Sequence, residues 1–141
     1  MTDTLSPSQR SERMSRVRSR NTKPELAVRH FLHAAGLRYR LHQRVAGARP
    51  DLVFPSRKLV VFIHGCMWHQ HPAPDCKLAR LPKSRLEFWR PKLEGNVARD
   101  ERQRAALEEA GWTVLTIWEC EARDRSKLAA LAEQVGTAAI R

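Results

Sequence analysis

The centre of the chain carries Leu59-Val60-Val61-Phe62-Ile63-His64-Gly65-Cys66-Met67-Trp68-His69-Gln70-His71, an apolar run followed at once by a cluster of metal-type side chains. The continuous apolar run over 59–64 predicts a buried, central strand. The eight residues 64–71 hold three histidines, one cysteine and one tryptophan. The sequence therefore predicts a functional site where this strand ends.

Hydrophobic periodicity on either side of this strand predicts the remaining elements. Thr22 and Pro24 are typical of a helix start, Gly36 of a helix end, and Ser126 is a candidate cap for the last helix. The order predicts an α/β or α+β fold, in which helices flank a mixed sheet. The expected elements are a helix over 23–35, strands over 37–43, 51–54 and 59–64, an irregular segment over 66–86, a helix over 92–110, a strand over 112–118 and a helix over 124–140.

Positive charge is concentrated near the start of the chain. The 141 residues include 26 Lys and Arg against 15 Asp and Glu, a net charge of +11. Such an excess attracts a polyanion and favours a nucleic-acid partner, although a basic surface that serves only solubility is the alternative. We expect residues 1–20 to form a flexible basic arm, with a short helix near 8–18, and residues 21–141 to form one domain.

No apolar stretch approaches the length of a membrane span, and no hydrophobic segment near the start resembles a signal peptide. We therefore expect an intracellular protein. Three cysteines cannot all pair with one another, which makes metal ligation a serious candidate role for them.

Four residues form a candidate structural zinc set: Cys66, His71, Cys76 and Cys120. Cys66 and Cys120 each follow a predicted strand, and the other two residues lie on the long irregular segment, which a closed zinc site would tether to the sheet. Free cysteines are also common as small buried hydrophobes, so the spacing alone leaves both interpretations open.

Asp51 follows Pro50 at the head of a predicted strand, where a carboxylate can hold a divalent cation for phosphoryl chemistry. The acid and lysine that many nucleases carry on the next strand are missing, so Asp51 alone is better explained as a cap or a turn residue. His64 and His69 favour a catalytic role for Asp51, because neutral imidazoles can accept a proton from water. From the residues alone, Glu25 is a capping-box partner of Thr22, Asp100 a solvated ion-pair residue, and His30, His33 and His42 ordinary surface or packing residues.

Aromatic residues beside basic ones can insert between stacked bases. Trp68 lies next to the histidine cluster, and Trp89 follows the basic residues 83–85. For Trp112 and Trp118 a role in the core is the better explanation.

In combination these segments resemble the very short patch repair endonucleases, the Vsr family of bacterial mismatch-specific DNA nickases. The resemblance covers about residues 9–138. The segments that carry it are Arg13-Met14-Ser15-Arg16-Val17-Arg18-Ser19-Arg20-Asn21-Thr22-Lys23-Pro24-Glu25, Ala48-Arg49-Pro50-Asp51-Leu52-Val53, Phe62-Ile63-His64-Gly65-Cys66-Met67-Trp68-His69, Phe88-Trp89, Asn96-Val97-Ala98-Arg99-Asp100, and Gly111-Trp112 through Trp118-Glu119-Cys120.

The resemblance implies a fold similar to type II restriction endonucleases and a Mg²⁺-dependent enzyme that nicks 5′ of the thymine in T:G mismatches left by deaminated 5-methylcytosine. It implies that double-stranded DNA is the partner, with mismatch-repair proteins as further candidates. A monomeric, cytoplasmic bacterial protein that acts at the nucleoid is expected.

The implied roles are assigned residue by residue. Asp51 and the main chain of Ile63 would hold Mg²⁺, His69 would be the general base, and His64 would assist at the phosphate. Glu25 and Asp100 would support them. The remaining implied residues are the zinc ligands Cys66, His71, Cys76 and Cys120, the wedge residues Met67, Trp68 and Trp89, and the basic residues Arg16, Arg18, Arg20 and Lys23 that would clasp the duplex.

This chain departs from the family pattern at two positions: Ile63 stands where Thr is usual, and Met67 where an aromatic ring is usual. The loop between His71 and Cys76 is also expected to be longer than in the best-known members of the family, which implies a different sequence preference. Two alternatives remain: a related nuclease with a different target, and a non-catalytic, zinc-stabilised DNA-binding module.

Overall fold

The computed structural model describes residues 22–81 and 84–139. It contains the predicted order of helix, three strands, helix, strand and helix. The elements are α2 (Lys23–Ala34), β1 (Arg40–Leu41), β2 (Leu52–Phe54), β3 (Leu59–His64), α3 (Leu86–Glu109), β4 (Thr113–Trp118) and α4 (Arg125–Thr137), with short 3₁₀ turns at Pro55–Arg57, Lys77–Ala79 and Glu121–Arg123.

The strands form one mixed sheet in the order β1-β2-β3-β4. β1 pairs with β2, and β2 with β3, in antiparallel fashion, whereas β3 and β4 run parallel over six residue pairs from Leu59↔Thr113 to His64↔Trp118. β3 is buried along almost its whole length, as its apolar sequence predicts. Because β3 and β4 end together, the segments that follow them meet at one edge of the sheet.

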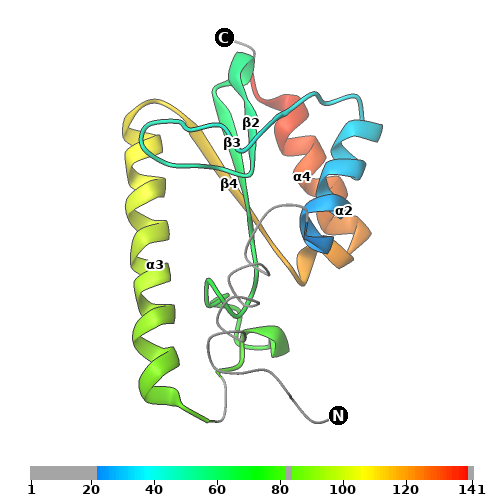
Figure 1. The fold of residues 1–141 in the computed structure, drawn as a ribbon. Coiled ribbons are helices and arrows are strands. Elements are labelled where there is room, and N and C mark those ends of the chain that lie inside the picture. Colours follow the sequence, from blue (N-terminus) through cyan, green and yellow to red (C-terminus); the bar gives the residue numbers. More distant parts are fainter. Residues whose placement is uncertain (1–21, 82–83, 140–141) are drawn as a thin grey trace.

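Helices cover both faces of the sheet, with α3 on one side and α2 and α4 on the other (Figure 1). Val28, Leu32 and Leu131 pack from α2 and α4 against β2 and β3. On the opposite face, Leu107 of α3 packs against Val60 and neighbouring side chains. The predicted α/β fold with a central mixed sheet is therefore confirmed.

Two predicted elements differ from the structure. The strand predicted over 37–43 is reduced to Arg40–Leu41, and both residues are exposed because this strand lies at the sheet edge. The helix predicted from residue 92 begins six residues earlier, at Leu86, with Pro91 inside it. Proline removes a helical hydrogen bond, but burial of Trp89 and Leu93 on either side of it favours a continuous helix.

The cap of the last helix is also corrected. Asp124, not Ser126, is the N-cap of α4, and its carboxylate accepts hydrogen bonds from the backbone N–H and the hydroxyl of Ser126. The helix ends at Thr137. Within the described ranges, no helix is long and apolar enough to cross a membrane.

Candidate active site

Asp51 lies at the start of β2, directly after the buried Pro50. Its Oδ2 accepts a hydrogen bond of 2.7 Å from the backbone N–H of Ile63 on the neighbouring strand. The pKa of Asp51 is raised from 3.8 to about 6, chiefly by burial and with a smaller contribution from the nearby Glu25 carboxylate, against the lowering effect of the Ile63 hydrogen bond. A bound cation would favour the charged form of this carboxylate, so Asp51 is suited to hold a metal ion.

Glu25 and His42 join Asp51 from two other parts of the chain. The Glu25 N–H lies 3.4 Å from the hydroxyl of Thr22, as the capping box predicts. The Glu25 side chain is buried, and its Oε1 lies 2.8 Å from Nε2 of His42. His42, expected to be an ordinary surface or packing residue, is half-buried and forms a cluster with Glu25 and Asp51 that could hold a metal ion.

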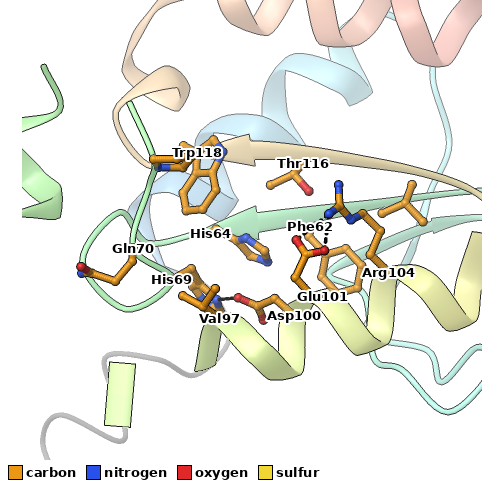
Figure 2. Close-up of a pocket in the computed structure, with 12 residues that line it drawn as sticks. Phe62, His64, His69, Gln70, Val97, Asp100, Glu101, Arg104, Thr116 and Trp118 are labelled. Carbon is orange, nitrogen blue, oxygen red and sulfur yellow. Dashed lines mark hydrogen bonds and ion pairs between the residues drawn. The ribbon is translucent and has the colours of Figure 1, made fainter. Parts of the chain in front are cut away.

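His64, His69 and Asp100 form the second half of the site (Figure 2). The rings of His64 and His69 are stacked, with centroids 3.9 Å apart and an interplanar angle of 8°. Nδ1 of His69 lies 2.5 Å from Oδ2 of Asp100, which belongs to α3. Asp100 is therefore not the solvated ion-pair residue expected from its neighbours, because it contacts His69.

The electrostatics of this pair make His64 a neutral imidazole. The pKa of His64 is lowered to about 4, chiefly by burial and with a smaller contribution from the proximity of His69, although Asp100 acts in the opposite direction. Among the described residues, Nδ1 of His64 has no hydrogen-bond partner. An ionised carboxylate can only accept a hydrogen bond, so the contact with Asp100 favours the tautomer of His69 that carries its proton on Nδ1 and has Nε2 as the acceptor nitrogen.

The two halves converge on shared clefts. Asp51, Glu25 and His69 line a cleft of about 310 Å³, together with Glu119. A neighbouring cleft of about 270 Å³ is lined by Asp51, His64, His69 and Asp100, together with Arg49 and Arg99. Asp51 and His69 thus line the same clefts, as predicted, and two arginines lie beside this candidate metal ligand and candidate base. A third cleft, of about 450 Å³, lies against the other side of the histidine pair, between α3 and the sheet (Figure 2).

The predicted metal-binding cluster of three cysteines and His71 is also brought together. Nδ1 of His71 lies 3.8 Å from the Cys66 sulfur and 3.4 Å from the Cys120 sulfur, and the Cys76 and Cys120 sulfurs are 3.9 Å apart. Tetrahedral zinc places two sulfurs about 3.8 Å apart and a sulfur and a nitrogen about 3.6 Å apart. The cluster therefore fits one zinc ion. Trp118 stacks on the His71 ring, with centroids 4.4 Å apart.

The wedge residues lie in an aromatic cluster beside the 310 Å³ cleft. Met67 and Trp68 line that cleft and are half-buried. Trp89 is buried against Trp68, with ring centroids 5.7 Å apart, whereas the neighbouring Phe88 is 45% exposed. Phe88 is therefore the exposed ring of the 88–89 pair. The ammonium of Lys92 lies 5.7–5.8 Å from the ring centroids of Trp68, Phe88 and Trp89.

The structure also places several other residues for which the sequence predicts a role or an environment. Lys23 is exposed and lines the 310 Å³ cleft. His30 and His33 are exposed, as expected. Trp112 is half-buried and packs against the core on the α3 side. Arg16, Arg18 and Arg20, with the expected short helix near 8–18, lie outside the described residues.

Sequence reasoning assigned no role to His42, Glu119, Arg49 or Arg99. Arg49, Arg99 and Glu119 stand inside the segments that carry the family resemblance, which was an available signal. The Glu119 carboxylate accepts a hydrogen bond of 3.3 Å from the N–H of Cys66, so it links the cleft to the zinc cluster. For His42 the sequence held no signal, because its partner Glu25 is 17 positions away.

The fold is an α/β domain with a central mixed sheet, and it has a counterpart among solved structures. The catalytic domain of the homing endonuclease I-Bth0305I has a similar fold, with a TM-score of 0.53 and 24% identity over 82% of this chain and 92% of that one. The profile of the family described as DNA mismatch endonuclease Vsr matches residues 2–77.

Two characterised relatives align over most of the chain. The type II nicking enzyme V.XorIIP of Xanthomonas oryzae pv. oryzae is 53% identical over 92% of this chain and 93% of that protein. The DNA mismatch endonuclease Vsr of Escherichia coli K12 is 39% identical over 91% and 80%, respectively. This chain therefore belongs to the Vsr family of DNA mismatch endonucleases and nicking enzymes.

Proposed function

We propose that this protein nicks one strand of duplex DNA immediately 5′ of the thymine in a T:G mismatch. The observation that carries the proposal is the convergence of Asp51 and His69 on one cleft, next to Arg49 and Arg99. A carboxylate for a cation, an imidazole for a proton and two guanidinium groups for phosphate are the parts that phosphodiester hydrolysis needs. The names of the nicking and mismatch relatives support this target.

Asp51 and the main-chain carbonyl of Ile63 are the proposed Mg²⁺ ligands, and Glu25 orders water beside them. When bound, Mg²⁺ supplies positive charge that stabilises the charge developing on the scissile phosphate. Ile63 acts through its backbone in this scheme, so the absence of a side-chain hydroxyl there does not remove a ligand. The N–H of Ile63 already fixes Asp51 at 2.7 Å, so one residue positions both ligand groups.

His69 is the proposed general base. Its Nδ1 is turned to Asp100, which leaves Nε2 to accept the proton of the attacking water and lets the carboxylate stabilise the resulting imidazolium. His64 stays uncharged above about pH 4, so it acts at the phosphate as a neutral hydrogen-bonding group.

The aromatic cluster and the basic arm are the proposed DNA contacts. Met67, Trp68 and Trp89 form the wedge that opens the base stack at the mismatch, with Phe88 as the exposed ring beside them. Arg16, Arg18, Arg20 and Lys23 clasp the duplex. One nick requires one active site, so a monomer is sufficient.

Replacing Asp100 with Asn tests the role of the His69 contact. An amide cannot stabilise the imidazolium by charge and also permits the wrong tautomer, so we expect kcat to fall about 10²- to 10⁴-fold with little change in DNA affinity. Single-turnover nicking and binding assays measure the two effects. Glu101→Gln, which removes the next carboxylate along α3, is the matched control. Equal kcat values for the two variants would exclude Asp100 from the mechanism.

A nicking assay tests the proposed target. We expect Mg²⁺-dependent cleavage of only the thymine strand, 5′ of the mispaired base, and no cleavage of T:A or C:G duplexes with the same flanks. End-labelled duplexes in several sequence contexts locate the nick. Cleavage of matched duplexes would identify a restriction-like enzyme instead, and salt-dependent binding without cleavage would identify a DNA-binding module.

A further inference from the structure

We propose that His42 is a further protein ligand of the catalytic cation: together with Asp51, and with Glu25 coordinating directly rather than through water, it forms a site that prefers Mn²⁺ to Mg²⁺. This inference rests on the proposed function, in which Asp51 holds that cation. It adds an imidazole nitrogen to a site otherwise made of oxygen atoms.

The three side chains are close enough to share one ion. Nε2 of His42 lies 2.8 Å from Oε1 of Glu25. One ligand atom from each of His42, Glu25 and Asp51 lies within 4.8 Å of the others. Around an octahedral ion with bonds of about 2.1 Å, neighbouring ligands lie about 3.0 Å apart and opposite ligands about 4.2 Å apart. The cluster therefore needs only small side-chain movements to surround a cation.

The stacked pair His64 and His69 is a weaker candidate for such a site, although it also lies near a carboxylate. Its rings are almost parallel, at 8°, and their lone pairs lie in the ring planes. Nitrogen atoms of two rings stacked face to face cannot both direct lone pairs at one ion between them. Of the histidines near the cleft, His42 is the one whose Nε2 already contacts a carboxylate of the candidate metal site.

The backbone holds His42 at Asp51. His42 is the first residue after β1, and the pairing of Leu41 with Leu52 brings it beside the start of β2. Its N–H donates a hydrogen bond of 3.1 Å to the carbonyl of Asp51. His42 also has φ +52°, a left-handed conformation that costs a non-glycine residue energy and that proteins tend to keep at functional sites.

The charge of the cluster favours a cation. The Glu25 side chain is only 4% exposed and the His42 side chain 12% exposed. Two carboxylates held together away from water repel each other, and a divalent ion offsets that repulsion. Imidazole is a better ligand for Mn²⁺ and the later first-row metals than for Mg²⁺, which prefers oxygen and keeps its waters. The nitrogen of His42 therefore sets the metal preference.

Manganese binding to the full chain, purified with its zinc, tests the proposal. Pulsed electron paramagnetic resonance of bound Mn²⁺ reports coupling to a ligated histidine nitrogen, and labelling histidine with the heavier nitrogen isotope identifies that signal without any substitution. We expect histidine coupling in the wild type and in His33→Ala, the control at an exposed histidine. We expect His42→Ala to lose it.

Calorimetric titration provides the second measurement. We expect His42→Ala to weaken Mn²⁺ binding about 10- to 100-fold and to change Mg²⁺ binding much less. Equal losses for both metals, or a histidine coupling that disappears in His69→Ala but persists in His42→Ala, would overturn the assignment and leave His42 as a structural partner of Glu25. If Asp51→Asn leaves Mn²⁺ binding unchanged, the metal site in the proposed function fails instead, so the two failures are distinguishable.

Discussion

Replacement of Asp51 by Asn is expected to abolish nicking and, at the same time, to stabilise the protein in the absence of Mg²⁺. A metal ion contributes several kcal/mol to the transition state, so loss of its carboxylate ligand should lower kcat by roughly 10³-fold or more. The amide retains an oxygen that can accept the hydrogen bond from the Ile63 N–H. The local structure and the binding of mismatched DNA should therefore survive the substitution.

The gain in stability follows from the raised pKa of Asp51. In the unfolded chain the carboxyl ionises near its usual pKa of 3.8, whereas in the folded protein it ionises at about 6. Between these values the folded state holds more protons than the unfolded state, so the wild type loses stability as pH rises. Asn carries no charge at any pH, so its advantage is near zero below pH 3.8 and complete above about pH 6. A shift of this size, discounted for partial exposure, corresponds to about 2 kcal/mol at neutral pH.

Urea denaturation in buffer freed of divalent ions, without a chelator that would remove zinc, measures this gain. The difference between Asp51→Asn and the wild type should be much larger at about pH 7.5 than at about pH 4.5. Glu94→Gln makes the same chemical change at an exposed position of α3 and should show no comparable gain. An inactive variant that is less stable than the wild type at neutral pH would contradict the burial argument, and an active variant would remove Asp51 from the mechanism.

Replacement of Cys120 by Ser is the second large expected effect. We expect loss of the bound zinc and of more than about 4 kcal/mol of stability, since structural zinc sites bind with roughly 10–16 kcal/mol and small domains are stable by only about 5–15 kcal/mol. Most of the variant should then be unfolded at 37 °C. Burial raises the pKa of the metal-free Cys66 thiol to about 12, so a cation is required to stabilise its thiolate.

The position of the cluster explains why the effect should reach the active site. Cys66 follows β3 and Cys120 follows β4, so an ion bound by the cluster would join the ends of two parallel strands. His69 lies between the ligands Cys66 and His71, on a turn in which the His69 N–H donates to the carbonyl of Gly65. Loss of zinc should therefore release the general base as well as the loop.

Zinc content by elemental analysis and thermal unfolding measure this prediction. The wild type should carry one zinc per chain, and Cys120→His, which restores a ligand, should recover most of the zinc and stability. Thr113→Ser, at an exposed position of β4, controls for substitution on that strand. Full zinc content in Cys120→Ser, with an unchanged melting temperature, would refute the ligand assignment.

The sequence by itself determined the central strand, the element order and, apart from His42, the side chains of two candidate metal sites. The segment 59–64 is buried because five apolar side chains followed by His64 form a continuous run. Such a run fits only the centre of a sheet that is covered on both faces. Cys66, His71, Cys76 and Cys120 were also predictable as candidate metal ligands, because two of them each follow a predicted strand and the other two lie on the long irregular segment, although spacing alone left a role as small buried hydrophobes open for the cysteines. Such patterns involve residues that are close in the sequence, and the burial of apolar side chains gives them the same local structure wherever they occur.

Only the tertiary structure decided which side chains meet. Asp100 is 31 positions from His69. The sequence does not show whether this carboxylate of α3 faces solvent or the sheet, because the packing of the helix on the sheet decides it. His42 contacts Glu25 because the two-residue edge strand β1 ends where β2 begins. The hydrophobic periodicity of the sequence does not predict this contact. The helix start at Leu86 likewise depends on burying Trp89, which outweighs the local preference of Pro91 to interrupt a helix. Contacts between distant segments are fixed by sheet register and packing, whereas sequence patterns report only the few residues within one turn or strand.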